Sequence, residues 1–381
     1  MKKICMITTI SDTWKMLLIE QAKYQYAHGD FDITIVCSRD DAFAASLPPY
    51  LHYVPVEITR GFGLSMGRSI RELYRLFRRE KFDLVHYITI NASFCVSIAA
   101  WLARVPVRLY SEWGLRFQGF TGPMRRVMIG IEKTIARCST FISTDSRDSL
   151  EICRAMRIYP ASKSDVMWNG SPNGVSFEKF DVSRKAAWRR EKRAALGIPE
   201  GAFAFGYVGR ITRDKGVNEL FTAAKRLFEK YDDIVLVVIG PEVIAEPIDE
   251  GLFEWSKEEA RVYYTGFTTE VEKYMSMLDV SVLPSYREGF GNVIIEAEAL
   301  EIPVIASDIS GVRCAMQDGV TGRLVPAHSA DALFDAVEAL YRDPEESARM
   351  GKNGAAFVHG SFDQQILYEK KLALKQRLLG V

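Results

Sequence analysis

The sequence predicts an α/β protein with two doubly wound parallel sheets, and three observations lead to this fold class. At 381 residues the chain is too long for one ordinary domain and long enough for two. Apolar, β-rich runs alternate with stretches whose apolar residues recur with a period of about 3.6, which is the pattern of strand and helix in such a sheet. This alternation stops in a turn-rich segment at residues 168–174 and then resumes.

Six apolar runs in the first half are the predicted strands of the first sheet. They are Lys3–Ile10, Phe31–Cys37, His52–Val56, Leu84–Thr89, Val107–Ser111 and Thr140–Thr144. The stretches between them fit helices at Leu17–Ala27, Ile70–Arg79, Ala92–Ala103, Met124–Ala136 and Ser149–Met156. Because strand and helix alternate, we predict a Rossmann-like domain over residues 1–170.

The second half begins with a charged helix at Arg184–Leu196, which ends at Gly197-Ile198-Pro199. Predicted strands follow at Ala202–Val208, Ile234–Ile239, Val262–Tyr264, Val280–Leu283 and Val304–Ala306. Helical patterns begin near Val217, Thr268 and Gly291, and three more helices are expected at Ser329–Tyr341, Glu345–Val358 and Phe362–Leu379. We predict a second Rossmann-like domain over residues 171–358 and a helix over residues 359–381 that crosses back to the first domain.

The amino-acid composition excludes several protein classes. Hydrophobic residues form 48% of the chain and charged residues 26%, which is typical of a globular protein with a large core. Lys+Arg and Asp+Glu balance at 49 each, so we expect no nucleic-acid partner. Residues 1–170 nevertheless carry 23 basic and 16 acidic side chains, which leaves 26 basic and 33 acidic for the remainder. The two halves are therefore expected to have different partners.

The cysteines and the N-terminal segment indicate a cytoplasmic protein. The six cysteines have no CxxC spacing and lie mostly among apolar neighbours, as reduced, buried thiols do. The apolar run after Lys3 is short, contains threonines and is followed by no signal-peptide cleavage site. No stretch reaches the roughly 18 apolar residues that a membrane span needs.

Charged residues stand at a predicted strand end in the second half. Gly209 and Arg210 end the first strand, and Lys215 and Gly216 open the helix that follows. Two cations beside free helix N–H groups favour a diphosphate, and the glycines permit close approach of a ligand. A loop with two solvated basic residues is the alternative.

A second charged segment follows the predicted strand at Val280–Leu283. Glu288 lies on a loop where Gly289 and Gly291 expose backbone N–H groups, and Glu296 lies in the next helix. A fixed carboxylate accepts hydrogen bonds from sugar hydroxyls, and exposed amides suit a phosphate. Taken singly, Glu288 also fits a carboxylate stabilised by the helix dipole, and Glu296 fits a solvated helix face.

Together, Gly209-Arg210, Lys215-Gly216 and the Glu288-x7-Glu296 spacing resemble the donor half of the retaining GT-B glycosyltransferases of family 4. The resemblance extends to Asn169-Gly170, Asn173-Gly174-Val175, Thr265-Gly266-Phe267, residues 302–307 and Asp318-Gly319-x-x-Gly322. It covers residues 165–358 strongly and the first half by topology. It implies a GT-B fold, in which two Rossmann-like domains face a central cleft.

The resemblance implies roles for individual residues. Arg210 and Lys215 would neutralise the diphosphate of a nucleotide sugar and stabilise the departing nucleotide, and Glu288 would hold hydroxyls of the transferred sugar. Glu296 would bind the ribose. Further donor contacts are implied for Gly209, for the amides of Phe290, Gly291 and Asn292, and for Gly240, Thr265 and Phe267 near the base. In this family the donor phosphate is thought to help deprotonate the acceptor, so the resemblance implies no protein nucleophile and no cofactor.

The first half departs from the family pattern, because residues 8–14 lack the glycine pair that many members have after the first strand. Ser11 and Asp12 are candidates for binding acceptor hydroxyls, although capping of the following helix is the simpler role. His86 is either an acceptor-site residue or a core histidine. Glu112 follows a strand where many relatives have a histidine, and it is a candidate acceptor contact or base.

One acidic pattern imitates a metal site. Asp30-Phe31-Asp32 has the Asp-x-Asp spacing that another glycosyltransferase class uses for a metal ion. It precedes its predicted strand and would lie at the wrong edge of the sheet. We therefore predict no metal.

The basic excess of the first half is concentrated in two segments. They contain Arg68, Arg71, Arg75, Arg78, Arg79 and Lys81, and Arg116, Arg125 and Arg126 beside Phe117, Phe120 and Met124. Basic side chains beside apolar ones suit an anionic membrane surface and a phosphorylated lipid carrier. An ordinary solvated helix face is the alternative for residues 68–81.

These patterns lead to the hypothesis of a retaining glycosyltransferase. It would move a hexose or N-acetylhexosamine from a UDP-sugar to a glycan acceptor, carried on a polyprenyl diphosphate, in surface polysaccharide or glycoconjugate synthesis at the inner face of the cytoplasmic membrane. A nucleotide-sugar epimerase of the same architecture and a non-catalytic sugar-nucleotide-binding protein are the alternatives. The epimerase fits less well, because its chemistry needs carboxylates and a histidine around the sugar ring.

Overall fold

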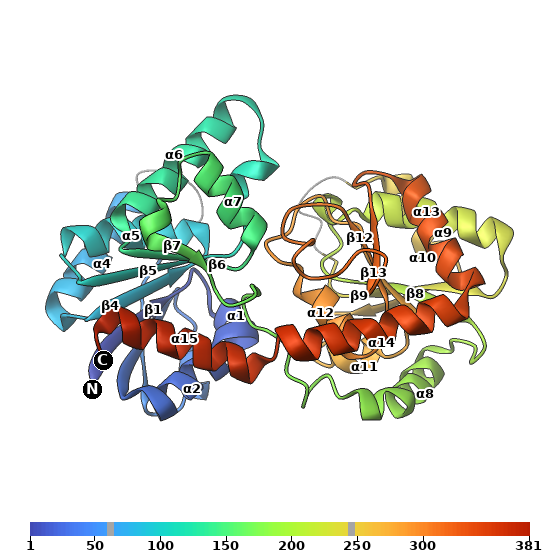
Figure 1. Cartoon of the computed structure of the whole chain (residues 1–381), viewed down its shortest axis with the longest axis horizontal. Helices are drawn as coiled ribbons and strands as arrows, with labels where there is room; N and C mark the ends of the chain where they lie inside the picture. Colours follow the sequence, from blue (N-terminus) through green and yellow to red (C-terminus); the bar gives the residue numbers. More distant parts are fainter. Residues whose placement is uncertain (59–64, 243–247) are drawn as a thin grey trace. The chain divides into compact units, whose positions relative to one another are not determined.

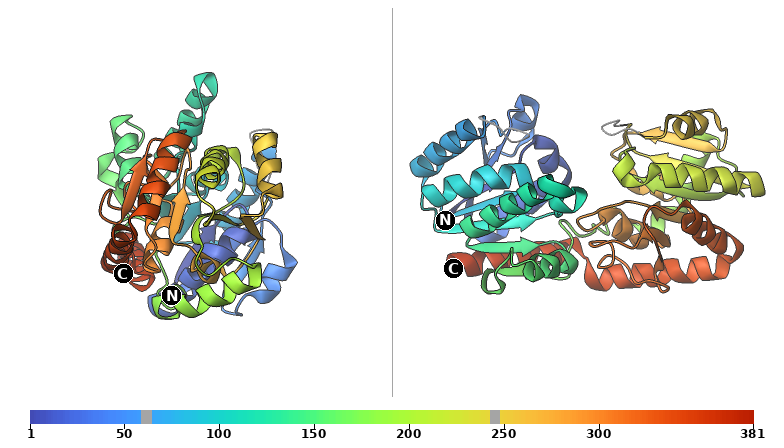
Figure 2. Two further views of the ribbon diagram at one scale, coloured as in Figure 1. Left: turned by 90° about the vertical axis from the view of Figure 1, so that its right-hand side faces the viewer. Right: turned by 90° about the horizontal axis from the view of Figure 1, so that it is seen from above.

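A computed structural model describes residues 1–58, 65–242 and 248–381 and divides the chain into two compact units. Unit 1 comprises Met1–Asn173 and Gln365–Val381, and unit 2 comprises Gly174–Gln364. Each unit contains one parallel sheet with helices on both faces, as Figures 1 and 2 show. The expected α/β fold with two Rossmann-like domains is confirmed.

Unit 1 has a seven-stranded sheet in the order β3-β2-β1-β4-β5-β6-β7. Its strands are β1 (Lys2–Ile7), β2 (Phe31–Cys37), β3 (Leu51–Pro55), β4 (Leu84–Ile88), β5 (Val107–Glu112), β6 (Phe141–Thr144) and β7 (Ser164–Val166). Its helices include α1 (Ser11–Thr13), α2 (Ile19–Gly29), α3 (Asp41–Ser46), α4 (Ser65–Glu80), α5 (Ile90–Leu102), α6 (Gly122–Cys138), α7 (Arg147–Ala155) and the C-terminal α15 (Gln364–Leu379). Helices α4 to α7 pack on one face of the sheet, and α2, α3 and α15 pack on the other.

Unit 2 has a six-stranded sheet in the order β10-β9-β8-β11-β12-β13. Its strands are β8 (Phe203–Val208), β9 (Ile234–Ile239), β10 (Val262–Gly266), β11 (Val280–Leu283), β12 (Val304–Ser307) and β13 (Gly322–Val325). Its helices include α8 (Lys185–Leu196), α9 (Val217–Lys230), α10 (Glu250–Glu258), α11 (Val271–Met275), α12 (Asn292–Ala299), α13 (Ala330–Arg342) and α14 (Pro344–Ser361). Helices α9, α10 and α13 pack on one face, and α8, α11 and α12 pack on the other.

Burial on both faces explains the composition of the central strands. Every residue of β9 is buried, and its sequence is an unbroken apolar run. In β8, Phe205 and Tyr207 pack on one side of the sheet while Ala204 and Val208 pack on the other. A strand that helices cover on both faces has no exposed side to carry polar residues.

The C-terminal helix α15 is anchored in unit 1 by apolar and polar contacts. Leu372 and Leu374 join the core beside β1 and β2. Lys375 is buried, and its Nζ donates a hydrogen bond to Oε1 of Gln25 on α2 at 2.6 Å. None of the helices in the described part of the chain has the length and hydropathy needed to cross a bilayer.

Several predicted boundaries were wrong for local reasons. The first strand ends at Ile7, because the Thr8 hydroxyl donates to the carbonyl of Ile10 at 2.9 Å and turns the chain. The last helix begins at Gln364 because Asp363 still pairs with Val175 in a β-bridge. Strands β7 and β13 and helices α3 and α10 were not predicted, since each is short or largely polar.

Candidate functional site

The predicted donor residues follow two adjacent strands of unit 2. β8 is the first strand of the unit, with β9 and β10 on one side of it and β11 on the other. In an open α/β sheet, ligands bind outside the carboxyl ends of the strands where the strand order reverses. Arg210 and Lys215 follow β8 and Glu288 follows β11, so the topology places these residues around that point.

Lys215 and Glu288 form an ion pair. The Nζ atom of Lys215 lies 2.6 Å from Oε1 of Glu288, and the Ser285 hydroxyl donates to the same oxygen at 2.8 Å. The two charged side chains are only 19% and 14% exposed. Water therefore screens this pair less than an ordinary surface ion pair.

The loops that carry these two residues are held together by backbone and side-chain contacts. Gly216 has a φ of 72°, and any side chain there would collide with the carbonyl of Pro284, which precedes the Glu288 loop. The amide of Tyr286 donates to the carbonyl of Asp214 at 2.9 Å, and Arg287 pairs with the Asp214 carboxylate at 3.1 Å. Lys215 and Glu288 are thus positioned by their own neighbours.

Asp214 and Tyr286 were missed by the sequence analysis. Burial opposes ionisation of Asp214, but the Thr212 hydroxyl and nearby arginines outweigh it and lower the pKa of the carboxyl. The Tyr286 hydroxyl donates to the carboxylate of Glu219 on α9 at 2.7 Å, and its ring packs on His328 with centroids 3.7 Å apart. The only feature of the sequence that could have identified Asp214 and Tyr286 was that they lie one and two residues away from Lys215 and Glu288.

Arg210 and the predicted base contacts lie on neighbouring loops of the same edge. The Arg210 side chain is exposed, and its carbonyl accepts a hydrogen bond from Tyr207 at 2.6 Å. A side chain at Gly240 would collide with the carbonyl of Gly209, so the loops after β8 and β9 lie close together. The Gly240 amide also donates to the carbonyl of Gly266 at 3.1 Å.

Thr265 and Phe267 lie on either side of Gly266 at the end of β10. The Thr265 hydroxyl donates to the carbonyl of Gly266 at 2.9 Å, and the Phe267 side chain is 68% exposed. An exposed aromatic ring beside strand ends is available for stacking.

The start of α12 exposes backbone and not the Phe290 ring. Phe290 is buried and packs edge to face on Phe362 with centroids 5.2 Å apart, so only its main chain is available to a donor. Gly291, with a φ of 78°, is the N-cap of α12, and Asn292 is the first residue of the helix. Glu296 lies one turn further and is partly buried. Burial raises its pKa to about 7, helped by Glu272 and opposed by Lys179.

In unit 1, the corresponding strand ends are those of β1 and β4. The hydroxyls of Thr9 and Thr89 lie 2.9 Å apart and join the loops after these strands. Ser11 donates to the carboxylate of Asp40 at 2.6 Å, and the Asp12 side chain is 70% exposed. The expectation that Ser11 or Asp12 caps the next helix was wrong, because both lie inside α1 and its N-cap is Ile10, with no side-chain cap bond.

His86 lies within the core of unit 1. It is 4% exposed, and its Nε2 atom lies 2.8 Å from the hydroxyl of Ser111. Burial and the nearby charges of Lys375 and Lys371 hold the pKa of His86 well below its usual range. The imidazole is therefore neutral near pH 7.

Glu112 at the end of β5 is also fully buried. Its Oε1 atom accepts a hydrogen bond from the amide of Gly114. Burial, with the neighbouring carboxyls of Asp145 and Glu132, raises the pKa of Glu112 well above its usual range. The structure thus separates the buried His86 and Glu112 from the exposed Asp12.

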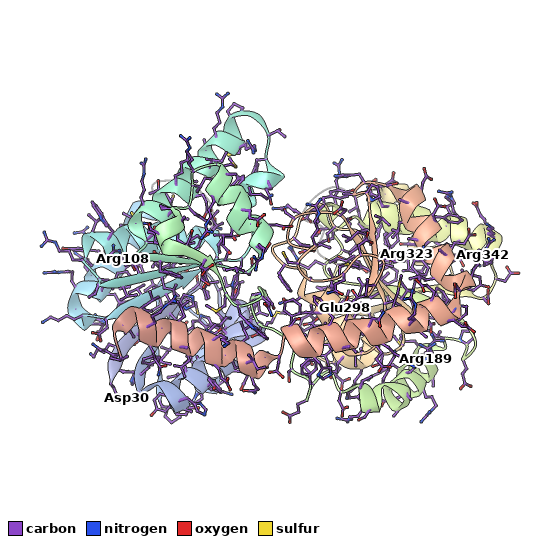
Figure 3. All side chains as sticks on the ribbon, in the orientation of Figure 1. Asp30, Arg108, Arg189, Glu298, Arg323 and Arg342 are labelled. Atoms are coloured by element: carbon purple, nitrogen blue, oxygen red, sulfur yellow. The ribbon has the colours of Figure 1, made fainter. Side chains whose placement is uncertain are left out.

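No metal site is found in the part of the chain that the structure describes. Asp30 follows α2 and immediately precedes β2, at the amino edge of the sheet (Figure 3). Among the described residues, no group of three or more His, Cys, Asp or Glu side chains is arranged to hold a metal ion.

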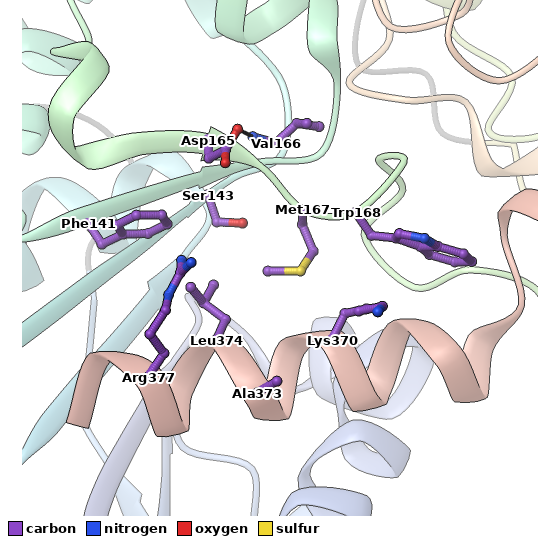
Figure 4. Close-up of a pocket in the computed structure, with 10 residues that line it drawn as sticks. All are labelled: Phe141, Ser143, Asp165, Val166, Met167, Trp168, Lys370, Ala373, Leu374 and Arg377. Carbon is purple, nitrogen blue, oxygen red and sulfur yellow. Dashed lines mark hydrogen bonds between the residues drawn. The ribbon is translucent and has the colours of Figure 1, made fainter. Parts of the chain in front are cut away.

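A separate hollow of about 270 Å³ lies in unit 1 between strands β6 and β7 and helix α15 (Figure 4). Phe141, Met167 and Trp168 line one side, and Lys370 and Arg377 of α15 line the other. None of the predicted site residues lines this hollow.

Comparisons with known proteins show which family and fold this chain resembles. The sequence matches the model of the family glycosyl transferases group 1 over residues 189–357 and that of glycosyl transferase 4-like over residues 3–146. It is 31% identical over 342 residues to the capsular polysaccharide biosynthesis glycosyltransferase CapM of Staphylococcus aureus. The aligned residues cover 90% of this chain and 88% of CapM. It is 27% identical over 319 residues to the UDP-Gal:alpha-D-GlcNAc-diphosphoundecaprenol alpha-1,3-galactosyltransferase of Escherichia coli, covering 82% and 81% of the two chains.

Solved structures share the fold. Sucrose-phosphate synthase from Thermosynechococcus elongatus superposes on this chain with a TM-score of 0.81 at 20% sequence identity. The superposition covers 100% of both chains. HepE of Anabaena, solved in complex with UDP and glucose, has a TM-score of 0.80 at 18% identity and covers 99% of this chain and 100% of its own. This architecture defines the GT-B class of glycosyltransferases. The chain belongs to the glycosyl transferases group 1 family, and it is a glycosyltransferase.

Proposed function

We propose that the protein is a retaining hexosyltransferase that transfers a hexose or N-acetylhexosamine from a UDP-sugar to a glycan acceptor. The observation that carries this proposal is the pairing of Lys215 with Glu288, next to Arg210, where β8 and β11 end. The Escherichia coli relative is named for a UDP-galactose donor, and the HepE structure contains UDP. Both names support the choice of UDP.

The donor would lie along the carboxyl edge of unit 2. Arg210 and Lys215 bind the diphosphate, and Glu288 accepts hydrogen bonds from the transferred sugar. The amides of residues 290–292 at the start of α12 donate to the sugar or the phosphates, since helix N-termini favour anions. Glu296 binds the ribose, and the base lies near Gly240 and the exposed Phe267 ring.

Transfer in this scheme breaks the bond between the anomeric carbon and the phosphate oxygen and forms a bond from that carbon to the acceptor oxygen. A donor phosphate oxygen takes the acceptor proton on the same face, so the anomeric configuration is kept. The cations Arg210 and Lys215 stabilise the charge that develops on the departing nucleotide. No step requires a metal ion or a protein nucleophile.

The acceptor would lie at the carboxyl edge of unit 1. Asp12 is exposed there, and Ser11 lies beside it in a hydrogen bond with Asp40. The buried Glu112 and His86 would support this edge from within the unit. The name of the Escherichia coli relative includes a diphosphoundecaprenol, which favours a lipid-linked glycan as the acceptor class.

A lipid-linked acceptor implies work at a membrane surface, which we place at the cytoplasmic face. The cations of α4 are exposed, and on α6 Met124 and Val127 are 48% and 51% exposed beside Arg125 and Arg126. Phe117 is buried and Phe120 is partly buried, so Met124 and Val127 are the more exposed apolar side chains of this segment. Sedimentation with phosphatidylglycerol vesicles tests this: binding that salt weakens is expected, and no binding at low salt would remove the membrane from the proposal.

A panel of UDP-sugars with simple glycoside acceptors tests the function as a whole. Mass spectrometry should detect free UDP and a glycoside one sugar heavier, with the anomeric configuration of the donor retained. Interconversion of the UDP-sugar without an acceptor would instead identify an epimerase. Donor binding without any product would identify a sugar-nucleotide-binding protein.

A further inference from the structure

The ion pair between Lys215 and Glu288 joins two groups that the proposed function assigns to different parts of the donor. Lys215 would bind the diphosphate, and Glu288 would hold the transferred sugar. In the structure Nζ of Lys215 lies 2.6 Å from Oε1 of Glu288. Each group therefore has the other as its partner in this structure, and a donor that binds both groups has to compete with their contact.

The surroundings of this pair make the contact between Lys215 and Glu288 strong enough to compete with the binding of a ligand. Both side chains are less than one fifth exposed, so the attraction between them is weakly screened. The contact is also a charge-assisted hydrogen bond, which is stronger than a neutral one. Ser285 donates to the same carboxylate oxygen at 2.8 Å and keeps it directed towards Lys215.

We propose that Glu288 competes with the donor diphosphate for Lys215, so that the same carboxylate orients the sugar and weakens the binding of the nucleotide alone. The proposal rests on the proposed function for the roles of the two residues. A nucleotide sugar offers a phosphate to Lys215 and a hydroxyl to Glu288. A nucleoside diphosphate offers only the phosphate and leaves a mostly buried carboxylate without its cation, which is costly.

The competition has a consequence for turnover. When the sugar has moved to the acceptor, the hydrogen bonds from sugar to Glu288 are lost. The carboxylate then recaptures Lys215 and displaces the diphosphate of the spent nucleotide. Glu288 thus favours release of the product as well as orientation of the substrate.

Isothermal titration of UDP into the wild type and three variants tests the competition. Glu288→Gln keeps the shape of the side chain and removes its charge, and we expect the Kd for UDP to fall about five- to tenfold, as removal of a partly buried ion-pair partner implies. Lys215→Met should weaken UDP binding. In the double variant, Glu288→Gln should change the Kd little, because Lys215, the cation for which Glu288 and the phosphate compete, is absent.

Asp214→Asn is the matched control for a general effect of charge. Asp214 is also an acidic residue beside Lys215 and Arg210 and is electrostatically coupled to both, but its carboxylate hydrogen-bonds Thr212 and Arg287. If loss of any nearby negative charge tightened UDP binding, this variant would gain as much as Glu288→Gln. We expect a clearly smaller gain.

An unchanged or higher Kd in Glu288→Gln, or an equal gain in the Lys215→Met background, would overturn the competition and leave the proposed function standing. The wild type is titrated with UDP, GDP and ADP, and the cycle is run with the nucleotide that binds most tightly. Failure of all three to bind would instead remove the proposed function, and the competition with it.

Discussion

The two sheets have the same strand order around their first strand, yet different side chains join the loops at the equivalent point. In unit 2, Lys215 and Glu288 join the loops after β8 and β11 through an ion pair. In unit 1, Thr9 and Thr89 join the loops after β1 and β4 through their hydroxyls. The shared topology fixes where a ligand is expected, and the side chains determine which ligand suits each place.

The charged groups of the two edges also differ in exposure. Lys215 and Glu288 are partly exposed and can exchange each other for a ligand. Glu112 and His86 of unit 1 are buried, and each already has a hydrogen-bond partner inside the protein. We infer that the unit 2 pair acts directly on the donor and that the unit 1 pair maintains the structure around the acceptor.

The largest effect is expected from Lys215→Ala and Glu288→Ala. Each variant removes a group that would contact the donor, and we expect transfer to fall about 100- to 1,000-fold, the loss typical of a removed transition-state contact. Circular dichroism should match the wild type, and the melting temperature should fall modestly, because each variant leaves a largely buried charge without its partner. Near-normal turnover in either variant would contradict the inference that the unit 2 pair, unlike Glu112 and His86, acts directly on a substrate.

A loss of stability is expected from Glu112→Ala and His86→Ala. Both substitutions empty space in the interior and leave a former hydrogen-bond partner unsatisfied, so the free energy of unfolding should fall by about 1–3 kcal/mol. Urea unfolding measures this. Unchanged stability together with a raised acceptor KM would show instead that these side chains contact the acceptor.

Glu298 of α12 provides a pH-dependent test of a buried carboxyl in unit 2 (Figure 3). Burial raises its pKa from an ordinary 4.5 to about 8, opposed by the Thr321 hydroxyl. Between these pH values the folded protein holds a proton that the unfolded chain has released, so stability falls as the pH rises. The melting temperature of the wild type should therefore fall relative to Glu298→Gln from pH 5 to pH 8. A constant difference would contradict the raised pKa.

The smallest effect is expected from Asp12→Ala. The side chain is 70% exposed and would supply one hydrogen bond to the acceptor, so its loss should raise the acceptor KM about two- to fivefold. The donor KM should not change, because Asp12 belongs to unit 1. Steady-state kinetics with each substrate varied in turn separates the two constants. A rise confined to the donor KM would show that Asp12 contacts the donor and not the acceptor.

The sequence predicted the buried strands well because the apolar pattern that marks such a strand lies within the strand itself. The runs Ile234–Ile239 and Val280–Leu283, which are apolar except for Ser281, are β9 and β11 to the residue, since buried parallel strands favour side chains that are apolar on both faces. The edge strand β7 consists of Ser164, Asp165 and Val166 and has no such pattern. Only its pairing with β6 makes it a strand, and that pairing is not visible in the sequence.

The sequence predicted which residues of the site follow the ends of strands, but it did not predict the contacts between those residues. The positions of Lys215 and Glu288 after β8 and β11 followed from the alternation of strand and helix. Their direct ion pair depends on the close approach of the two loops at Gly216, which composition cannot reveal. The burial of Glu112 and His86 likewise depends on the elements that pack around β4 and β5, so the sequence could not decide whether His86 is a site residue or a core residue, and it gave no sign that Glu112 is buried.

A crystal structure of the full chain with a bound UDP-sugar tests the central claim most directly. The account predicts the diphosphate on Arg210 and Lys215, the sugar hydroxyls on Glu288 and the ribose on Glu296, with the ion pair between Lys215 and Glu288 broken. A nucleotide bound elsewhere, or bound while that ion pair remains intact, would contradict it.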